Sequence, residues 1–182
     1  MSNTVLTALR RLKATGEEVA AMELPYPASA PSFGPACCDA EIEELLASYR
    51  AAVPGYATFL SACRRIDGAD VHNGYFIYSP LTAVTQLHTP RRIVVGDEPR
   101  LREVPVLAVG GDGCGNAFLI GLDGPEAEAV WKWNHEHPPR EDGVGRTGLV
   151  KIADSFVAFL DRLATDWERF ASGDTTWTYV SG

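Results

Sequence analysis

Long apolar runs are missing from this chain of 182 residues. No stretch approaches the ~20 consecutive apolar residues that a membrane-spanning helix needs. The first thirty residues carry Arg10, Arg11 and Lys13, but no apolar stretch follows them in the order of a signal peptide. We therefore expect a cytoplasmic protein that has no membrane partner.

Cysteine is also scarce. The four cysteines are Cys37, Cys38, Cys63 and Cys114. The adjacent pair does not form a CxxC motif, and no spacing fits a zinc knuckle or a disulfide framework. Cys63 falls on an apolar helical face, which favours a place in the core over the role of a nucleophile. We expect reduced, partly buried thiols.

Common catalytic motifs are absent too. No G-x-S-x-G occurs, so the chain lacks a nucleophile elbow. Residues 110–116, GGDGCGN, lack the third glycine of a dinucleotide loop and the lysine of a P-loop, and the strand-like AFLIGL follows them where both motifs need a helix. We predict a hairpin turn in which at least one glycine has positive φ, and no bound ion or phosphate.

Two segments of the sequence resemble metal sites in part, and neither fits one. A calcium loop that begins at Asp112 would need an oxygen ligand where Cys114 stands and a glycine where Ala117 stands. His135 and His137 alternate as on a strand and could face one metal ion, but HEHPP is not HExxH and no third ligand is near in sequence. We expect a polar strand end, with no metal and no cofactor.

The formal net charge is −8, and the acidic residues are unevenly spread. The segment from Glu103 to Glu136 holds six acidic residues and one base, Lys132. Such a surface repels nucleic acid and attracts a basic partner, although a solvated face is the common alternative. We expect a partner-binding contribution from Asp97, Glu98, Asp112, Glu126 and Glu128.

Apolar spacing predicts helices at both ends of the chain. Residues 4–15 suit a first helix for which Gly16 is the expected stop, with a continuation through the apolar piece Val19 to Leu24 as the alternative. The four prolines of residues 25–36 predict an extended connection. Asp39 is expected to cap a second helix. A third helix is expected to begin at Pro54 and to end at the Asp67-Gly68 turn. Its apolar face carries Tyr56, Phe59, Leu60 and Cys63. The last helix is expected at 154–171.

The middle of the chain changes to strand periodicity. Strands are expected at 75–78, 91–95, 104–109, 117–122 and 128–133. In the last of these, Val130 and Lys132 share one face, and Trp131 and Trp133 share the other. Short loops join the final three strands, so an antiparallel meander is predicted.

Taken in order, four sequence blocks resemble the SUKH superfamily, which includes bacterial immunity proteins and fungal cell-wall assembly regulators. The blocks are VPGYATFL at 53–60 with the Asp67-Gly68 turn behind it, GDGCGNAFLIGLD at 111–123, VWKWNHE at 130–136 and IADSFVAFLDRL at 152–163. The resemblance covers residues 39–165. It departs from the family pattern in the first block, where Tyr56 comes one residue early and the Asp67-Gly68 turn a few residues late.

The resemblance implies an α+β fold with helices packed on one face of a mainly antiparallel sheet. Residues 1–38 would form an N-terminal helix and proline-rich connection, packed on a single SUKH-like unit, 39–182. The residues of the structural signature would be Pro54, Tyr56, Phe59, Gly68, Gly113, Trp131, Phe156 and Leu160.

The family has no known active site, so the resemblance implies a protein-binding domain and no enzyme. Its expected role is that of an immunity protein that binds and neutralises a basic toxin domain, for example a nuclease. An intracellular adaptor or regulator of the same fold is the alternative. A metal-dependent hydrolase that uses His135 and His137 is a more distant one.

Overall fold

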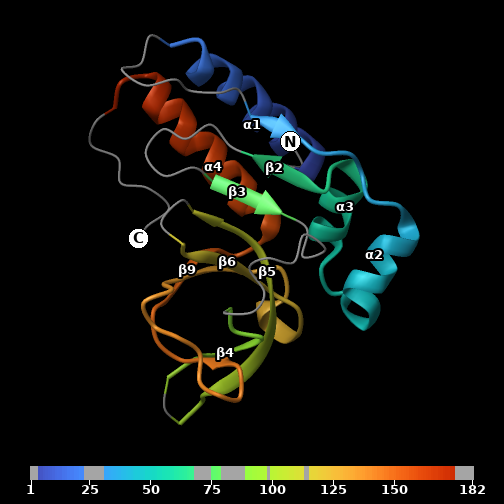
Figure 1. Cartoon of the computed structure of the whole chain (residues 1–182), viewed down its shortest axis with the longest axis vertical. Coiled ribbons are helices and arrows are strands. Elements are labelled where there is room, and N and C mark those ends of the chain that lie inside the picture. Colours follow the sequence, from blue (N-terminus) through green and yellow to red (C-terminus); the bar gives the residue numbers. More distant parts are fainter. Residues whose placement is uncertain are drawn as a thin grey trace.

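A computed structural model describes residues 4–22, 31–67, 75–78, 89–97, 99–112 and 115–174. Gly68, Glu98, Gly113 and Cys114, named above, lie outside these ranges. The fold is α+β, as predicted: helices cover one face of a curled, mainly antiparallel sheet (Figure 1). The helices are α1 (Val5–Ala20), α2 (Asp39–Leu46), α3 (Pro54–Ala62) and α4 (Phe156–Ala171), with short 3-10 turns η1 (Ala47–Tyr49) and η3 (Gly124–Glu126).

The described strands form one sheet in the order β1-β2-β3-β5-β6-β7-β9, and β4 joins it by pairing with β5 and β8. Among the pairings of these described strands, only β4–β8 is parallel. The strands are β1 (Ser32–Phe33), β2 (Arg65–Asp67), β3 (Tyr75–Tyr78), β4 (Arg92–Val95), β5 (Arg102–Asp112), β6 (Ala117–Gly121), β7 (Val130–Trp133), β8 (Val144–Gly145) and β9 (Leu149–Ala153).

Strand β5 explains the curl of the sheet. Its first residues pair with β4 and its last residues pair with β3, and its register against β6 shifts between Ala108 and Gly110. Such an irregularity bends a strand and increases its twist. One sheet can therefore serve two separate hydrophobic clusters, one on each face.

The two faces of β7 follow the predicted alternation. Val130 belongs to the larger core under the helices, together with Phe118 and Ile120 of β6. Trp131 and Trp133 point to the other side, into a smaller core that β4 and β5 enclose. The two-residue period of a strand produces this separation.

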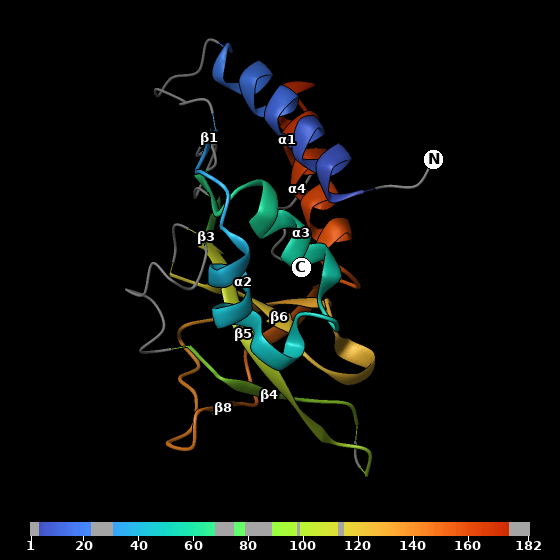
Figure 2. The same ribbon diagram turned by 90° about the vertical axis from the view of Figure 1, so that its right-hand side faces the viewer.

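Helix α1 lies along α4 (Figure 2), and an ion pair links their exposed sides. Arg11 donates to the Glu168 carboxylate and to the Thr165 hydroxyl at 2.9 Å. The predicted stop at Gly16 is wrong, because α1 continues to Ala20. Gly16 is instead a buried point of close approach, where an added Cβ would lie 2.6 Å from the Trp167 ring.

Several predicted boundaries need correction. Cys38, not Asp39, is the residue that precedes α2 as its N-cap. Asp67 belongs to strand β2 and does not form a turn at the end of α3, which stops at Ala62. Pro54 does occupy the first turn of α3, as predicted. None of the helices in the described ranges is long and apolar enough to cross a bilayer.

The glycine-rich segment is a hairpin connection between β5 and β6. β5 ends at Asp112, and β6 begins at Ala117. Gly115 has φ +90°, a left-handed conformation that glycine adopts without strain. The predicted positive-φ glycine is confirmed, but the predicted bounds of the turn, 110–116, are wrong, because residues 110–112 belong to β5 and pair with β3.

Candidate partner-binding surface

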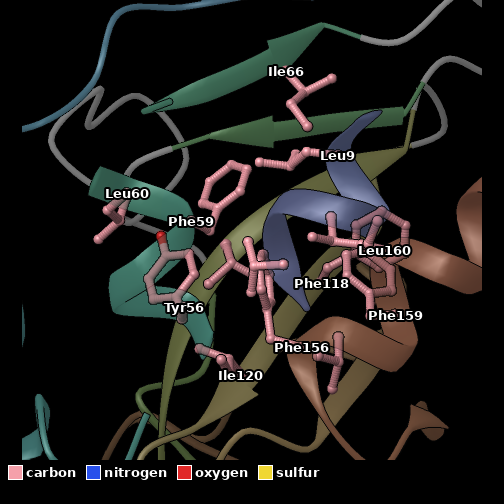
Figure 3. Packing of buried hydrophobic residues seen from close by; sticks show 14 of the residues in the cluster. Leu9, Tyr56, Phe59, Leu60, Ile66, Phe118, Ile120, Phe156, Phe159 and Leu160 are labelled. Atoms are coloured by element: carbon pink, nitrogen blue, oxygen red, sulfur yellow. The ribbon is translucent and has the colours of Figure 1, made fainter. Parts of the chain in front are cut away.

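Aromatic residues of the structural signature meet in the core beneath the helices. Figure 3 shows Tyr56 and Phe59 of α3 facing Phe156 of α4. The ring centroids of Tyr56 and Phe156 are 5.0 Å apart, and those of Phe59 and Phe156 are 5.2 Å apart, both edge-on. All three residues are fully buried. Such aromatic pairs add to the stability that burial provides.

Leu160 and Trp131 are buried as well, but in different clusters. Leu160, on α4, packs in the same cluster as the aromatic residues. Trp131 lies in the smaller cluster on the opposite face of the sheet. Pro54 is exposed at the first turn of α3. Packing accounts for the buried signature residues, and helix initiation accounts for Pro54.

Glu128, one of the five predicted partner-binding residues, is half-buried against α3. Its carboxylate accepts hydrogen bonds from the backbone N–H groups of Gly55 and Tyr56. These groups belong to the first turn of α3, where helix N–H groups have no partner within the helix. Glu128 holds this position with φ +66°, which is strained for a residue other than glycine.

Glu126 is also engaged within the chain. Its carboxylate lies between Arg102, with which it forms an ion pair, and Lys151, whose Nζ is 3.1 Å away. Only 17% of the side chain is exposed. Lys151 in turn lies over the Trp131 ring and pairs with Asp154.

Asp112 organises the glycine hairpin. Its side chain is 8% exposed and lies 3.2 Å from Lys132 Nζ. It also accepts from the backbone and side-chain nitrogens of Asn116, at 3.0 and 2.8 Å. Asn116 Oδ1 is then 3.2 Å from His135 Nδ1. The network explains Asp112 and Asn116 as residues that fix the hairpin.

Asp97 is the one described member of the predicted set that remains exposed, at the connection between β4 and β5. This connection forms the lower end of the molecule in Figure 1. The Asp97 carbonyl accepts from Arg100 N–H at 2.6 Å, so the connection closes as a tight turn. Leu101 follows, with 43% of its surface exposed.

The uneven acidic charge of the sequence is therefore not one open acidic surface. Glu126, Glu128 and Asp112 use their carboxylates inside the chain, through Arg102, Lys151, Lys132 and the α3 amides. Sequence patterns gave no sign of these pairings, because the two partners in each lie many residues apart. In the described part of the β4–β5 connection, the acidic Asp97 and the apolar Leu101 are both on the surface and are open to a partner.

The histidines and cysteines form no metal centre in the described ranges. There, no group of three or more His, Cys, Asp or Glu residues could hold an ion. His135 and His137 are exposed in the turn after β7. Burial raises the pKa of the Cys63 thiol to about 12, so this buried side chain stays protonated at neutral pH.

Comparison with known proteins adds no relative: no family model, no curated protein and no solved structure matches this chain.

Proposed function

We propose that this chain is a non-catalytic, SUKH-like immunity protein, which binds a basic toxin domain and blocks its action. The proposal rests on the order of the sequence blocks and on how the fold brings them together. It names the partner by chemistry: a protein domain whose active surface is positively charged, such as that of a nuclease.

The observation that carries the proposal is the meeting of two distant blocks, 53–60 and 152–163, at α3, where Glu128 also binds. Glu128, which comes just before β7, binds the first turn of α3. Phe156 of α4 packs edge-on against Tyr56 and Phe59 of the same helix. Tyr56, Phe59 and Phe156, which belong to the two blocks, thus form one connected core. This supports the resemblance and, through it, the function.

The net charge of the chain supports a basic partner. The support is weaker than the sequence suggested, because most of the predicted acidic residues use their carboxylates inside the chain. The formal net charge of −8 favours fast encounter with a basic domain. We place the direct contact at the β4–β5 connection, where Asp97 and Leu101 are exposed. Asp112, Glu126 and Glu128 then act by keeping the scaffold in shape, without touching the partner.

Co-expression tests this function. The chain is produced together with a basic nuclease toxin domain taken from a neighbouring gene, and cell growth is followed. Growth rescue by this chain, with no rescue of cells that carry an unrelated toxin, is the expected result. If growth is not rescued although both proteins are soluble, the immunity function is wrong, and an adaptor with another partner becomes the better explanation.

A further inference from the structure

His135 is an exposed residue in the turn after β7, but its ring is held in one place. Its Nδ1 atom lies 3.2 Å from Oδ1 of Asn116, in the hairpin between β5 and β6. The ring also lies against the hairpin backbone, because a Cβ added at Gly115 would be 3.5 Å from Nδ1. An exposed side chain that is already fixed loses little freedom when a partner binds it.

Asp112 determines which way the Asn116 amide faces. The Asp112 carboxylate accepts from the Asn116 backbone N–H at 3.0 Å and from its Nδ2 at 2.8 Å, and it lies 3.2 Å from Lys132 Nζ. A carboxylate that accepts hydrogen bonds can pair only with the NH₂ side of an amide. The carbonyl oxygen of Asn116 must therefore face His135.

The orientation of Asn116 in turn determines which nitrogen of His135 carries the proton. A carbonyl oxygen has no proton to donate, so Nδ1 must be the donor in this hydrogen bond. In a neutral ring, Nε2 then has the free lone pair and acts as an acceptor. Among the described residues, Nε2 has no hydrogen-bond partner. His135 thus presents an acceptor at the surface, on a ring that the hairpin holds still.

The charges around His135 favour a cationic donor. Glu136 follows it and is exposed, and in the described part of the chain its carboxylate makes no ion pair. The nearest base in sequence, Lys132, is engaged with Asp112 and does not compete for this carboxylate. An acceptor beside a negative charge suits a guanidinium group, which carries five N–H donors and a positive charge.

We propose that His135 Nε2 accepts a hydrogen bond from an arginine of the basic partner, and that Glu136 attracts the charge of this arginine. The inference rests on the proposed function and adds a second contact to the one at the β4–β5 connection. The two contacts lie at opposite ends of β5, which has 11 residues and spans at most ~36 Å. An interface of about 2,000 Å² or more covers such a distance.

The position of the proton can be tested in the free chain, without any partner. Long-range ¹H–¹⁵N NMR at pH 8 should find His135 with the proton on Nδ1. His137 is the internal control: its ring has no hydrogen-bond partner in the described part of the chain, so it should exchange between both forms. Asn116→Ala should give His135 the same mixture. A wild-type His135 with its proton mainly on Nε2 would overturn the inference.

The contact itself is tested by binding to a basic nuclease toxin domain that co-expression with this chain renders harmless. His135→Ala should weaken binding about 10–100-fold, because a hydrogen bond to a charged group is lost. The matched control, His137→Ala, should bind like the wild type, and both variants should unfold at the wild-type urea concentration. Equal affinity of His135→Ala and wild type would overturn this inference and leave the proposed function standing. If the wild-type chain binds no such domain, the proposed function fails, and the arginine contact fails with it.

Discussion

The Glu128 carboxylate accepts a hydrogen bond from the backbone N–H of Tyr56 at 3.1 Å, across 72 residues of sequence. This contact joins the turn just before β7 to α3, the helix that carries Tyr56 and Phe59 of the aromatic core. An anion at a helix N-terminus is stabilised both by the free N–H groups and by the helix dipole. Glu128 thus belongs to the scaffold, although its charge suggested a surface role.

Replacing Glu128 separates the effect of its side chain from that of its backbone. Glu128→Ala should lower the free energy of unfolding by about 1–2 kcal/mol, because two helix N–H groups lose their acceptor. Glu128→Gln keeps an acceptor and should cost only about 0.3–1 kcal/mol. Glu128→Gly should be less harmful than alanine by about 0.4–1 kcal/mol, since φ is +66° there.

Urea unfolding measures these differences. The control is Glu141→Ala, an exposed site where a change within about 0.5 kcal/mol is expected. If Glu128→Ala were as neutral as this control, the contact with α3 would contribute nothing to stability.

Ala47 is a second non-glycine residue with positive φ, and here a substitution should raise the free energy of unfolding. Ala47, at the end of α2, has φ 42° and ψ −118°, a conformation that suits glycine. Ala47→Gly should therefore raise the free energy of unfolding by up to about 1 kcal/mol. Ala40→Gly, on the exposed side of α2, should lower it by about 0.5–1 kcal/mol. Thermal melts compare the two variants, and the same sign in both would contradict the account.

Gly16 tests the close approach of α1 to its neighbours. Alanine is the better helix former by about 1 kcal/mol, but its Cβ would lie 2.4 Å from Pro31 Cγ and 2.6 Å from Trp167 Cζ3. Overpacking of this kind costs about 1–3 kcal/mol. Gly16→Ala should therefore be destabilising overall in chemical denaturation. A stabilised variant would mean that the two neighbours can move aside.

The Arg11–Glu168 pair should make stability depend on pH. A hydrogen bond from Arg11 is the largest cause that lowers the pKa of Glu168 below its ordinary value of 4.5. Because the folded pKa is depressed, the stabilisation is complete above 4.5 and is lost as the pH falls through the folded value. The Glu168 side chain is 43% exposed, so the contribution should stay below about 1 kcal/mol.

The comparison for this pair is wild type against Arg11→Met, by denaturant unfolding at several pH values. The difference between the two should shrink as the pH falls from about 6 to about 3. A difference that is constant over this range would show that Arg11 acts through packing alone.

Local patterns predicted the elements that bury a regular apolar stripe. Helix α4 follows the spacing of Phe156, Phe159, Leu160 and Leu163, and all four are buried. The alternation along β7 was also predictable from the sequence. Successive side chains of a strand point to opposite faces of the sheet, and Val130 and Trp131 do so. These features depend on neighbours in sequence.

Features that depend on distant contacts were missed. Gly16 looked like a helix stop, but the packing of Trp167 and Pro31 requires a small residue inside a continuing helix. Glu126 and Glu128 looked like free surface charge, but Arg102, Lys151 and the α3 amides bind them. Strands β1 and β8 have two residues each, too few to show a period.

The most direct test of the central claim is calorimetric titration of this chain into a basic nuclease toxin domain that co-expression with this chain renders harmless. The account predicts a one-to-one complex in which toxin activity falls in proportion to the chain added, and in which the chain is recovered unchanged. Asp97→Asn should slow association at low ionic strength and have less effect at ~0.15 M salt, where charges are screened beyond ~8 Å. Full toxin activity at saturating chain, with no heat of binding, would contradict the account.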